Sequence, residues 1–266
     1  MLHSQKTSRA FKSQTTAHPH TRLPIAHGAS SLVIMTRLQI NIWSDIACPW
    51  CYVGKRRFEA AFEQFEHKDS VDVTWRSFEL NPNAPPVERG SGTQAERLAR
   101  KYGSSVSEAE QRLQMMTELG AKAGITFRFD RMASGNTFAA HRLLHFAKEH
   151  GRQNELKERL LQAYMSEGLV MSDPEVLGRL AGEVGLDAKD AKEVARGTRY
   201  TDEARADEEE AQAIGISGVP FFVIGRYGIS GAQSTEVLLD ALNKAWSETA
   251  PLVVSDGQSC GTDGCV

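Results

Sequence analysis

The amino-acid sequence predicts an α/β fold in which a long helical segment separates a β-α-β unit from a β-β-α unit. Three observations predict it. Alternating apolar residues flank one amphipathic helix near the start, a long stretch with helical periodicity follows, and strand-like apolar runs return near residue 220. The 266 residues, 41% of them hydrophobic, are enough to form an ordinary hydrophobic core without disulfide or metal cross-links.

The first unit opens on the run LQINIW (Leu38–Trp43), whose apolar residues alternate as on one face of a strand. From Pro49 onward three phenylalanines recur at spacings of four and three, which predicts an amphipathic helix, and Val71–Trp75 alternates again. A right-handed crossover would make the two strands parallel. The segment Glu79–Gly92 is dense in Pro, Asn and Gly and predicts a loop.

The last unit begins where strand patterns return. The apolar run Phe221–Ile224, a Gly-Arg turn and a second short run predict a hairpin, and a final amphipathic helix ends near Trp246. Seven helices are predicted between the two units: Thr93–Tyr102, Ser107–Ala123, Asn136–His150, Asn154–Glu167, Asp173–Glu183, Ala188–Arg196 and Thr201–Ile214.

These patterns divide the chain into five segments. The first, residues 1–35, has four Lys or Arg and no Asp or Glu, a composition typical of a disordered extension. Its apolar run is too short for a signal-peptide core; a transit peptide, or translation that starts at Met35, is an alternative. The other segments are the β-α-β half (36–91), the helical insertion (92–214), the β-β-α half (215–248) and a flexible tail (249–266).

Composition also limits the partners. A net charge of -3 and the lack of an apolar run of membrane length predict that neither nucleic acid nor a membrane is a partner. Without an export signal we expect a cytoplasmic protein, in a compartment that keeps thiols reduced. The four cysteines fall in two pairs, Cys48/Cys51 and Cys260/Cys265, which in that setting indicates redox chemistry or metal binding.

Cys48 and Cys51 stand between a predicted strand and a predicted helix. Unpaired backbone N–H groups and the positive end of the helix dipole favour an anion at Cys48, and Pro49 suits the first helical turn. We therefore predict that Cys48 has a lowered pKa and is the nucleophile, while Cys51 resolves the mixed disulfide. The alternatives are a zinc half-site that Cys260 and Cys265 complete, and a purely structural disulfide between Cys48 and Cys51.

The tail carries the second pair in SCGTDGC, where two glycines and an Asp-Gly turn allow Cys260 and Cys265 to meet as a disulfide. The stretch from Glu248 to Cys260 extends to roughly 40 Å, beyond the radius of gyration of about 17 Å expected for a body of this size. We predict an auxiliary redox pair that exchanges electrons with Cys48/Cys51 or guards it. Two idle thiols in a disordered tail are the alternative.

CPWC at the start of a helix and SGVPFFV (Ser217–Val223) far downstream resemble the DsbA-like branch of the thioredoxin superfamily. The element order is then that of a thioredoxin fold with a large all-helical insertion. The resemblance implies that Val219–Pro220 is a cis-proline loop facing the cysteines, with the Val219 backbone paired to an extended substrate strand. From the residues alone, Pro220 is equally well a turn residue.

Three segments, WSDIACPWCYVGKRRFE (43–59), FELNP (78–82) and NTFAAHRLLHFA (136–147), are similar to FrnE-type proteins. These are relatives of hydroxychromene-carboxylate isomerases and kappa-class glutathione transferases, which usually carry Ser where this chain has Cys48, and which use glutathione. The cysteine therefore favours thiol–disulfide exchange here, and FrnE-type proteins also carry a C-terminal cysteine pair. The substrate site that we expect contains Pro49, Trp50, Asn136, Val219 and Pro220.

The sequence thus predicts a thiol–disulfide oxidoreductase or isomerase of protein substrates that needs no organic cofactor. Its redox partner would be a low-molecular-weight thiol or a thioredoxin-type reductant, and glutathione binding near Asn136, Val219 and Pro220 stays open. The rival functions are a glutathione-dependent isomerase or transferase of small aromatic substrates and a chaperone-like or metal-binding module. His141 and His145 have metal-ligand spacing on one helix, but without a third ligand we expect packing or hydrogen bonding.

Overall fold

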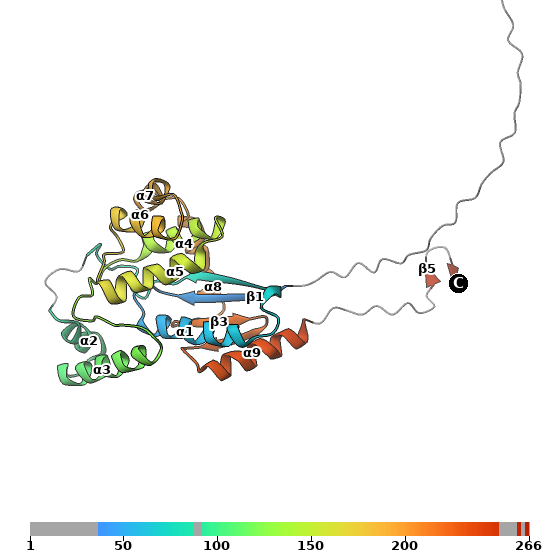
Figure 1. The fold of residues 1–266 in the computed structure, drawn as a ribbon, viewed down its shortest axis with the longest axis horizontal. Coiled ribbons are helices and arrows are strands. Elements are labelled where there is room, and N and C mark those ends of the chain that lie inside the picture. The colour runs from blue at the N-terminus through green and yellow to red at the C-terminus, as the bar shows by residue number, and fades with distance from the viewer. Residues whose placement is uncertain (1–36, 88–91, 250–259, 262–263, 266) are drawn as a thin grey trace, which may run out of the picture. The chain divides into compact units, whose positions relative to one another are not determined.

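The computed structural model describes residues 37–87, 92–249, 260–261 and 264–265. Its larger sheet has the strand order β2-β1-β3-β4 (Figure 1). The central strand β1 (Leu38–Ser44) is parallel to β2 (Val71–Ser77) and antiparallel to β3 (Phe221–Ile224), which forms a hairpin with β4 (Tyr227–Ser230). Residues almost 180 positions apart therefore lie on adjacent strands.

Apolar alternation in β1 buries both faces of the sheet. Leu38, Ile40 and Ile42 face two helices, α1 (Pro49–Gln64) and α9 (Thr235–Glu248), and form one core with them. On the opposite face, Trp43 is buried and its indole N–H donates to the backbone carbonyl of Asp207 at 2.8 Å. Helices thus cover the central strand from both sides, which the alternation alone did not predict.

The middle of the chain is helical, as predicted. Capping boxes start the first two of these helices: Thr93 and Glu96 satisfy each other's backbone N–H groups, and Ser105 and Glu108 do the same. The helices are α2 (Gln94–Tyr102), α3 (Val106–Lys122), α4 (Phe138–Glu149), α5 (Gln153–Gln162), α6 (Pro174–Glu183), α7 (Ala188–Arg196) and α8 (Thr201–Ala213), with a π-helical turn (Ala163–Glu167) after α5 and a 3₁₀ turn (Lys68–Ser70) before β2.

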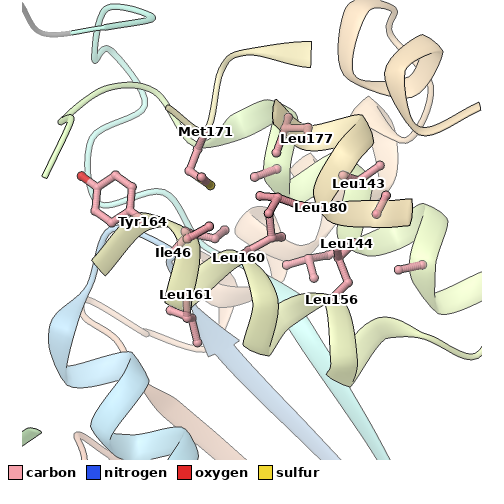
Figure 2. Packing of buried hydrophobic residues seen from close by; sticks show 14 of the residues in the cluster. Ile46, Leu143, Leu144, Leu156, Leu160, Leu161, Tyr164, Met171, Leu177 and Leu180 are labelled. Atoms are coloured by element: carbon pink, nitrogen blue, oxygen red, sulfur yellow. The ribbon is translucent and has the colours of Figure 1, made fainter. Parts of the chain in front are cut away.

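The core of the helical segment reaches the turn before α1. Figure 2 shows leucines of α4, α5 and α6, among them Leu143, Leu160 and Leu177, in one hydrophobic cluster that also contains Ile46. All four side chains are fully buried. Because Ile46 lies two residues before Cys48, this packing holds the cysteine turn against the helical segment.

A polar contact also joins the helical segment to the sheet. The side-chain amide of Gln153 accepts a hydrogen bond from the N–H of Trp75 at 3.0 Å and donates to the carbonyl of Trp75 at 2.9 Å. The Trp75 indole N–H donates to Asn154 at 3.0 Å. Gln153 thus pairs with the outer edge of β2 as another strand would, and leaves no buried backbone group of Trp75 unpaired.

The predicted α/β class, a thioredoxin-type sheet interrupted by helices, is confirmed. In the tail, β5 (Cys260–Gly261) and β6 (Gly264–Cys265) pair antiparallel with Cys260 opposite Cys265. The predicted extension 1–35 and the rest of the tail lie outside the described residues. Within the described ranges, no helix combines the length and apolar character that a membrane crossing requires.

Candidate active site

Cys48 and Cys51 lie where β1 passes into α1. Cys48 is the N-cap residue, with extended backbone angles (φ -98°, ψ 111°), and Pro49 fits the first turn because its nitrogen has no proton to satisfy. The N–H of Cys51 donates to the carbonyl of Cys48 at 3.0 Å. Both are free thiols; Cys48 is 5% exposed and Cys51 is 0% exposed. Cys48 is therefore the sulfur that a substrate reaches first.

The Val219–Pro220 peptide bond is cis and lies beside the cysteines. The Cys48 thiol donates to the carbonyl of Val219, with 3.5 Å between sulfur and oxygen. Close approach depends on Gly54 of α1, where an added Cβ would lie 2.9 Å from Cγ of Pro220. The structure thus brings together the two residues of the predicted loop and the predicted nucleophile. It also adds Gly54, which the sequence analysis missed.

The two sulfurs hydrogen-bond each other and titrate together. The hydrogen bond to Cys51, followed by burial, raises the pKa of Cys48 well above its ordinary value. Burial also opposes ionisation of Cys51, but the hydrogen bond from Cys48 and the positive charge of Lys157 outweigh it and lower the pKa of Cys51. After its first ionisation the pair therefore holds one proton that the two sulfurs share. The lowered pKa predicted for Cys48 is not found in this reduced state, because the hydrogen bond to Cys51 and burial raise the pKa of Cys48.

Lys157 of α5 supplies a positive charge to the buried pair. It is fully buried; its Nζ donates to the carbonyl of Ser44 at 3.3 Å and lies 5.7 Å from the centre of the Trp75 ring. Burial lowers the pKa of Lys157 to about 8, although the charges of Cys51 and Asp45 oppose the shift. At neutral pH the side chain is therefore mostly protonated. The sequence signal for it was a lysine on the apolar stripe of a helix, next to Leu156 and Leu160.

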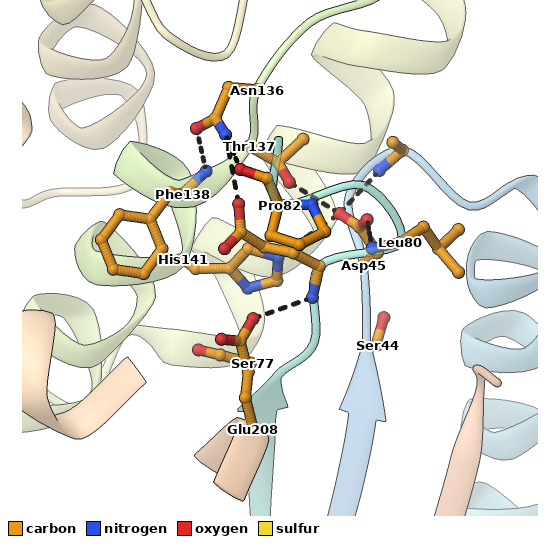
Figure 3. A network of polar contacts seen from close by, with 12 residues as sticks. Ser44, Asp45, Ser77, Leu80, Pro82, Asn136, Thr137, Phe138, His141 and Glu208 are labelled. Carbon is orange, nitrogen blue, oxygen red and sulfur yellow. Dashed lines mark hydrogen bonds and ion pairs between the residues drawn. The ribbon is translucent and has the colours of Figure 1, made fainter. Parts of the chain in front are cut away.

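Asp45 holds the cysteine turn to two distant segments (Figure 3). One carboxylate oxygen accepts hydrogen bonds from the N–H of Ala47 (3.2 Å) and the hydroxyl of Thr137 (2.9 Å) and lies 3.3 Å from Nε2 of His141. The other accepts from the N–H of Leu80 at 2.8 Å. Burial favours the neutral acid, but His141 and these N–H groups outweigh it and lower the pKa of Asp45. A buried carboxylate therefore fixes the loop that ends in the first cysteine.

The two histidines of α4 serve different carboxylates and share no ligand. His141 contacts Asp45, whereas Nε2 of His145 lies 3.1 Å from both the Ser77 hydroxyl and a carboxylate oxygen of Asp207. Among the residues described by the structure, no group of three or more His, Cys, Asp or Glu is placed to hold a metal. The side chains of Cys260 and Cys265 are outside those residues, so the predicted zinc alternative stays a prediction.

Asn136, predicted to contact substrate, is engaged in joining two loops (Figure 3). Its amide donates to Glu79 at 3.2 Å and to the carbonyl of Pro82 at 3.5 Å, and its oxygen accepts from the N–H of Phe138 at 2.9 Å. Asn136 thus lies just before α4, which begins two residues later than predicted, with Thr137 as its N-cap. Asn136 is not among the residues that line the cavity beside Cys48, and its role in substrate binding stays a prediction.

A cavity of about 780 Å³ opens beside Cys48. Pro49 and Trp50 form one wall, Leu80 belongs to the loop after β2, and α2 and α3 provide most of the rest. Trp50 is 40% exposed, so the predicted substrate residues Pro49 and Trp50 do border open space. The cavity is large enough for a small molecule or for several residues of an extended peptide.

Residues 39–243 match the model of the DSBA-like thioredoxin domain. This protein belongs to the DSBA-like thioredoxin domain family. It is 32% identical over 208 residues to the uncharacterized protein YwbO of Bacillus subtilis, covering 77% of this chain and 96% of that protein. Among solved structures it is similar to a probable DsbA oxidoreductase from Streptomyces coelicolor, at 43% identity and a TM-score of 0.76 over 86% of this chain and 99% of the other.

Two more distant solved structures share the fold. A 2-hydroxychromene-2-carboxylate isomerase is 12% identical with a TM-score of 0.60, covering 80% of this chain and 98% of the other. The cytosolic disulfide reductase DsbM from Pseudomonas aeruginosa, solved with GSH, is 17% identical with a TM-score of 0.53, covering 79% and 96%. The predicted DsbA-like membership is confirmed, and the FrnE subtype stays a prediction.

Proposed function

We propose that this protein is a thiol–disulfide oxidoreductase or isomerase that acts on protein disulfides through Cys48 and Cys51. The observation that carries the proposal is the reduced pair at the start of α1, whose reachable sulfur is hydrogen-bonded to the backbone of Val219. An extended substrate segment can pair its own backbone with Val219 beside Pro220. Pro49 and Trp50 border the same opening and complete the substrate site that we propose.

The exchange has two steps. The shared proton moves to Cys51, and the Cys48 thiolate attacks one sulfur of the substrate disulfide, whose S–S bond breaks as a Cys48–substrate disulfide forms. Cys51 then gives up its proton and attacks the sulfur of Cys48, which releases the second substrate thiol. The shared proton and one proton from solvent end on the two substrate thiols, and two electrons pass to the substrate. A low-molecular-weight thiol or a thioredoxin-type reductant restores the dithiol.

The tail pair completes this proposal. Cys260 and Cys265 stand opposite each other in the β5-β6 ladder, a backbone arrangement compatible with a disulfide. We assign them the auxiliary redox role and expect the Cys260→Ser, Cys265→Ser double variant to lose turnover with a limiting reductant while a single turnover stays normal. Cytoplasmic location is part of the same proposal, and the cytosolic DsbM, which shares this fold, supports it.

The deciding experiment is reactivation of a scrambled-disulfide protein in a glutathione buffer. We expect the wild type to accelerate it and the Cys48→Ser variant to fall to the rate of the buffer alone, because Cys48 is the less buried of the two cysteines. The Cys51→Ser variant should accumulate a mixed disulfide with substrate, visible on a non-reducing gel. Wild-type activity that survives in Cys48→Ser, or the absence of activity in the wild type, would overturn the proposal.

A glutathione-dependent reaction on small aromatic substrates is the second candidate. The cavity of about 780 Å³ beside Cys48 favours it, since aromatic and aliphatic side chains line much of this space. Isothermal titration with reduced glutathione separates the two functions. Saturable binding by the wild type, together with no effect on protein disulfides, would favour the isomerase or transferase.

A further inference from the structure

The cavity beside Cys48 is lined by charged side chains that have no role in the proposed function. We infer, on the basis of the proposed function, that this cavity selects extended protein segments in which acidic and apolar residues flank the reactive disulfide cysteine. The cavity opens directly at Cys48, so side chains near the attacked sulfur must enter it. The side chains that line the cavity therefore influence which substrates react.

The charged side chains that line the cavity are all basic. The described lining contains two arginines and one lysine from α2 and Arg112 from α3, and neither Asp nor Glu. Lys101 of α2 lies with its Nζ 5.7 Å from the ring centre of Tyr102 and is exposed. The chain as a whole has a net charge of -3, whereas the charged residues in the described lining are all positive. An acidic substrate gains both faster encounter and correct orientation from such a wall.

Most of the remaining lining is apolar, and part of it is exposed. Tyr102 is 60% exposed and Met115 is 54% exposed, and Trp50 adds an aromatic side chain next to the cysteines. Flexible methionine and flat aromatic side chains accept many apolar partners. Folded proteins bury most of their large apolar side chains, whereas an unfolded or extended segment presents them. The apolar lining therefore points to a protein segment rather than to a compact hydrophilic thiol.

The test uses three fluorescent peptide disulfides of equal length, identical apolar residues and Glu, Gln or Lys beside the cysteine. The measured quantity is the second-order rate constant with the reduced full-length protein at low and high salt. We expect the Glu peptide to react about tenfold faster than the Gln peptide and the Lys peptide to be slowest, with the differences shrinking at high salt.

Variants locate the effect. In the Lys101→Gln, Arg112→Gln double variant the ratio of the Glu and Gln rate constants should fall towards one. The Lys189→Gln variant, which removes an exposed charge from α7, should keep the wild-type ratio. Equal rate constants for the three peptides, or a preference that survives the double variant, would overturn the inference while leaving the proposed function intact. If oxidised glutathione reacts and no peptide does, the proposed function fails as well.

Discussion

At the scale of single residues, Lys157 determines the electrostatics of the cysteine pair. A fully buried ammonium is costly, and its main hydrogen bond is to the neutral carbonyl of Ser44. Its positive charge lowers the pKa of Cys51, and the negative charge of Cys51 in turn favours protonated Lys157. The energy spent on burying the lysine is thus partly recovered when the pair carries one negative charge.

Replacing this lysine tests the argument. In Lys157→Met, a side chain of similar length without charge, the pKa of the first thiolate should rise, because the thiolate loses its nearby cation. Thiolate absorbance at 240 nm against pH measures the shift, and alkylation by iodoacetamide at pH 7 should slow about tenfold. Lys148→Met, on the exposed side of α4, is the control. An unchanged midpoint in Lys157→Met would show that Lys157 does not act on the sulfurs.

At the scale of elements, the contact between α1 and the loop before β3 sets the substrate opening. Gly54 lies one turn after Cys51, on the side of α1 that meets Pro220. The missing side chain lets the loop approach until the Val219 carbonyl accepts a hydrogen bond from Cys48. A glycine costs helical stability, so its presence here is explained by close packing.

Adding one methyl group should displace that loop. In Gly54→Ala the new Cβ would lie 2.9 Å from Cγ of Pro220, too close for either group to stay in place. We expect kcat/KM for protein disulfides to fall by about tenfold, because the substrate strand pairs out of position. Gly182→Ala in α6 is the matched control, since its Cβ would meet only Ala188 at 3.4 Å. Full activity in Gly54→Ala would refute the positioning role.

At the scale of the whole molecule, one buried aspartate, Asp207 of α8, joins the helical segment to strands β1 and β2. Asp207 accepts from the N–H of Ser77 at 2.8 Å and from Arg76 at 2.7 Å, and its backbone carbonyl accepts from Trp43. Burial raises the pKa of Asp207, but His145, Ser77 and Arg76 outweigh burial and lower it. The carboxylate thus stabilises the fold at neutral pH.

The lowered pKa of Asp207 predicts how the free energy of unfolding changes in acid. Because the folded pKa is lowered, stability from Asp207 is complete above the unfolded pKa of about 3.9 and is lost as pH falls through the folded value. Asp207→Asn should cost about 3 kcal/mol of unfolding free energy at pH 7, and the difference from wild type should shrink below pH 4. Urea unfolding at several pH values measures it, with exposed Glu209→Gln as control. A constant difference across pH would contradict the assignment.

The sequence by itself determined the type and order of the elements and the place of the reactive pair. Strand alternation in Leu38–Trp43 and helical spacing after Pro49 are local patterns. A C-x-x-C motif at the start of a helix can likewise be recognised from the sequence, whatever other segments pack against that helix. Family resemblance then singled out Val219–Pro220, which nothing in its own segment distinguished from a turn. These predictions needed only neighbouring residues or a known motif.

Tertiary structure alone decided which charges surround the pair. Lys157 and His141 are about a hundred residues from Cys48 in the sequence, and only packing of the helical segment on the turn brings Lys157 to the sulfurs and His141 to Asp45. The local dipole argument omits burial and the hydrogen bond to Cys51, which raise the pKa of Cys48. Electrostatic energy depends on distance in space and on burial. For that reason the pattern of the sequence identified the two cysteines, and the fold determined how they share a proton.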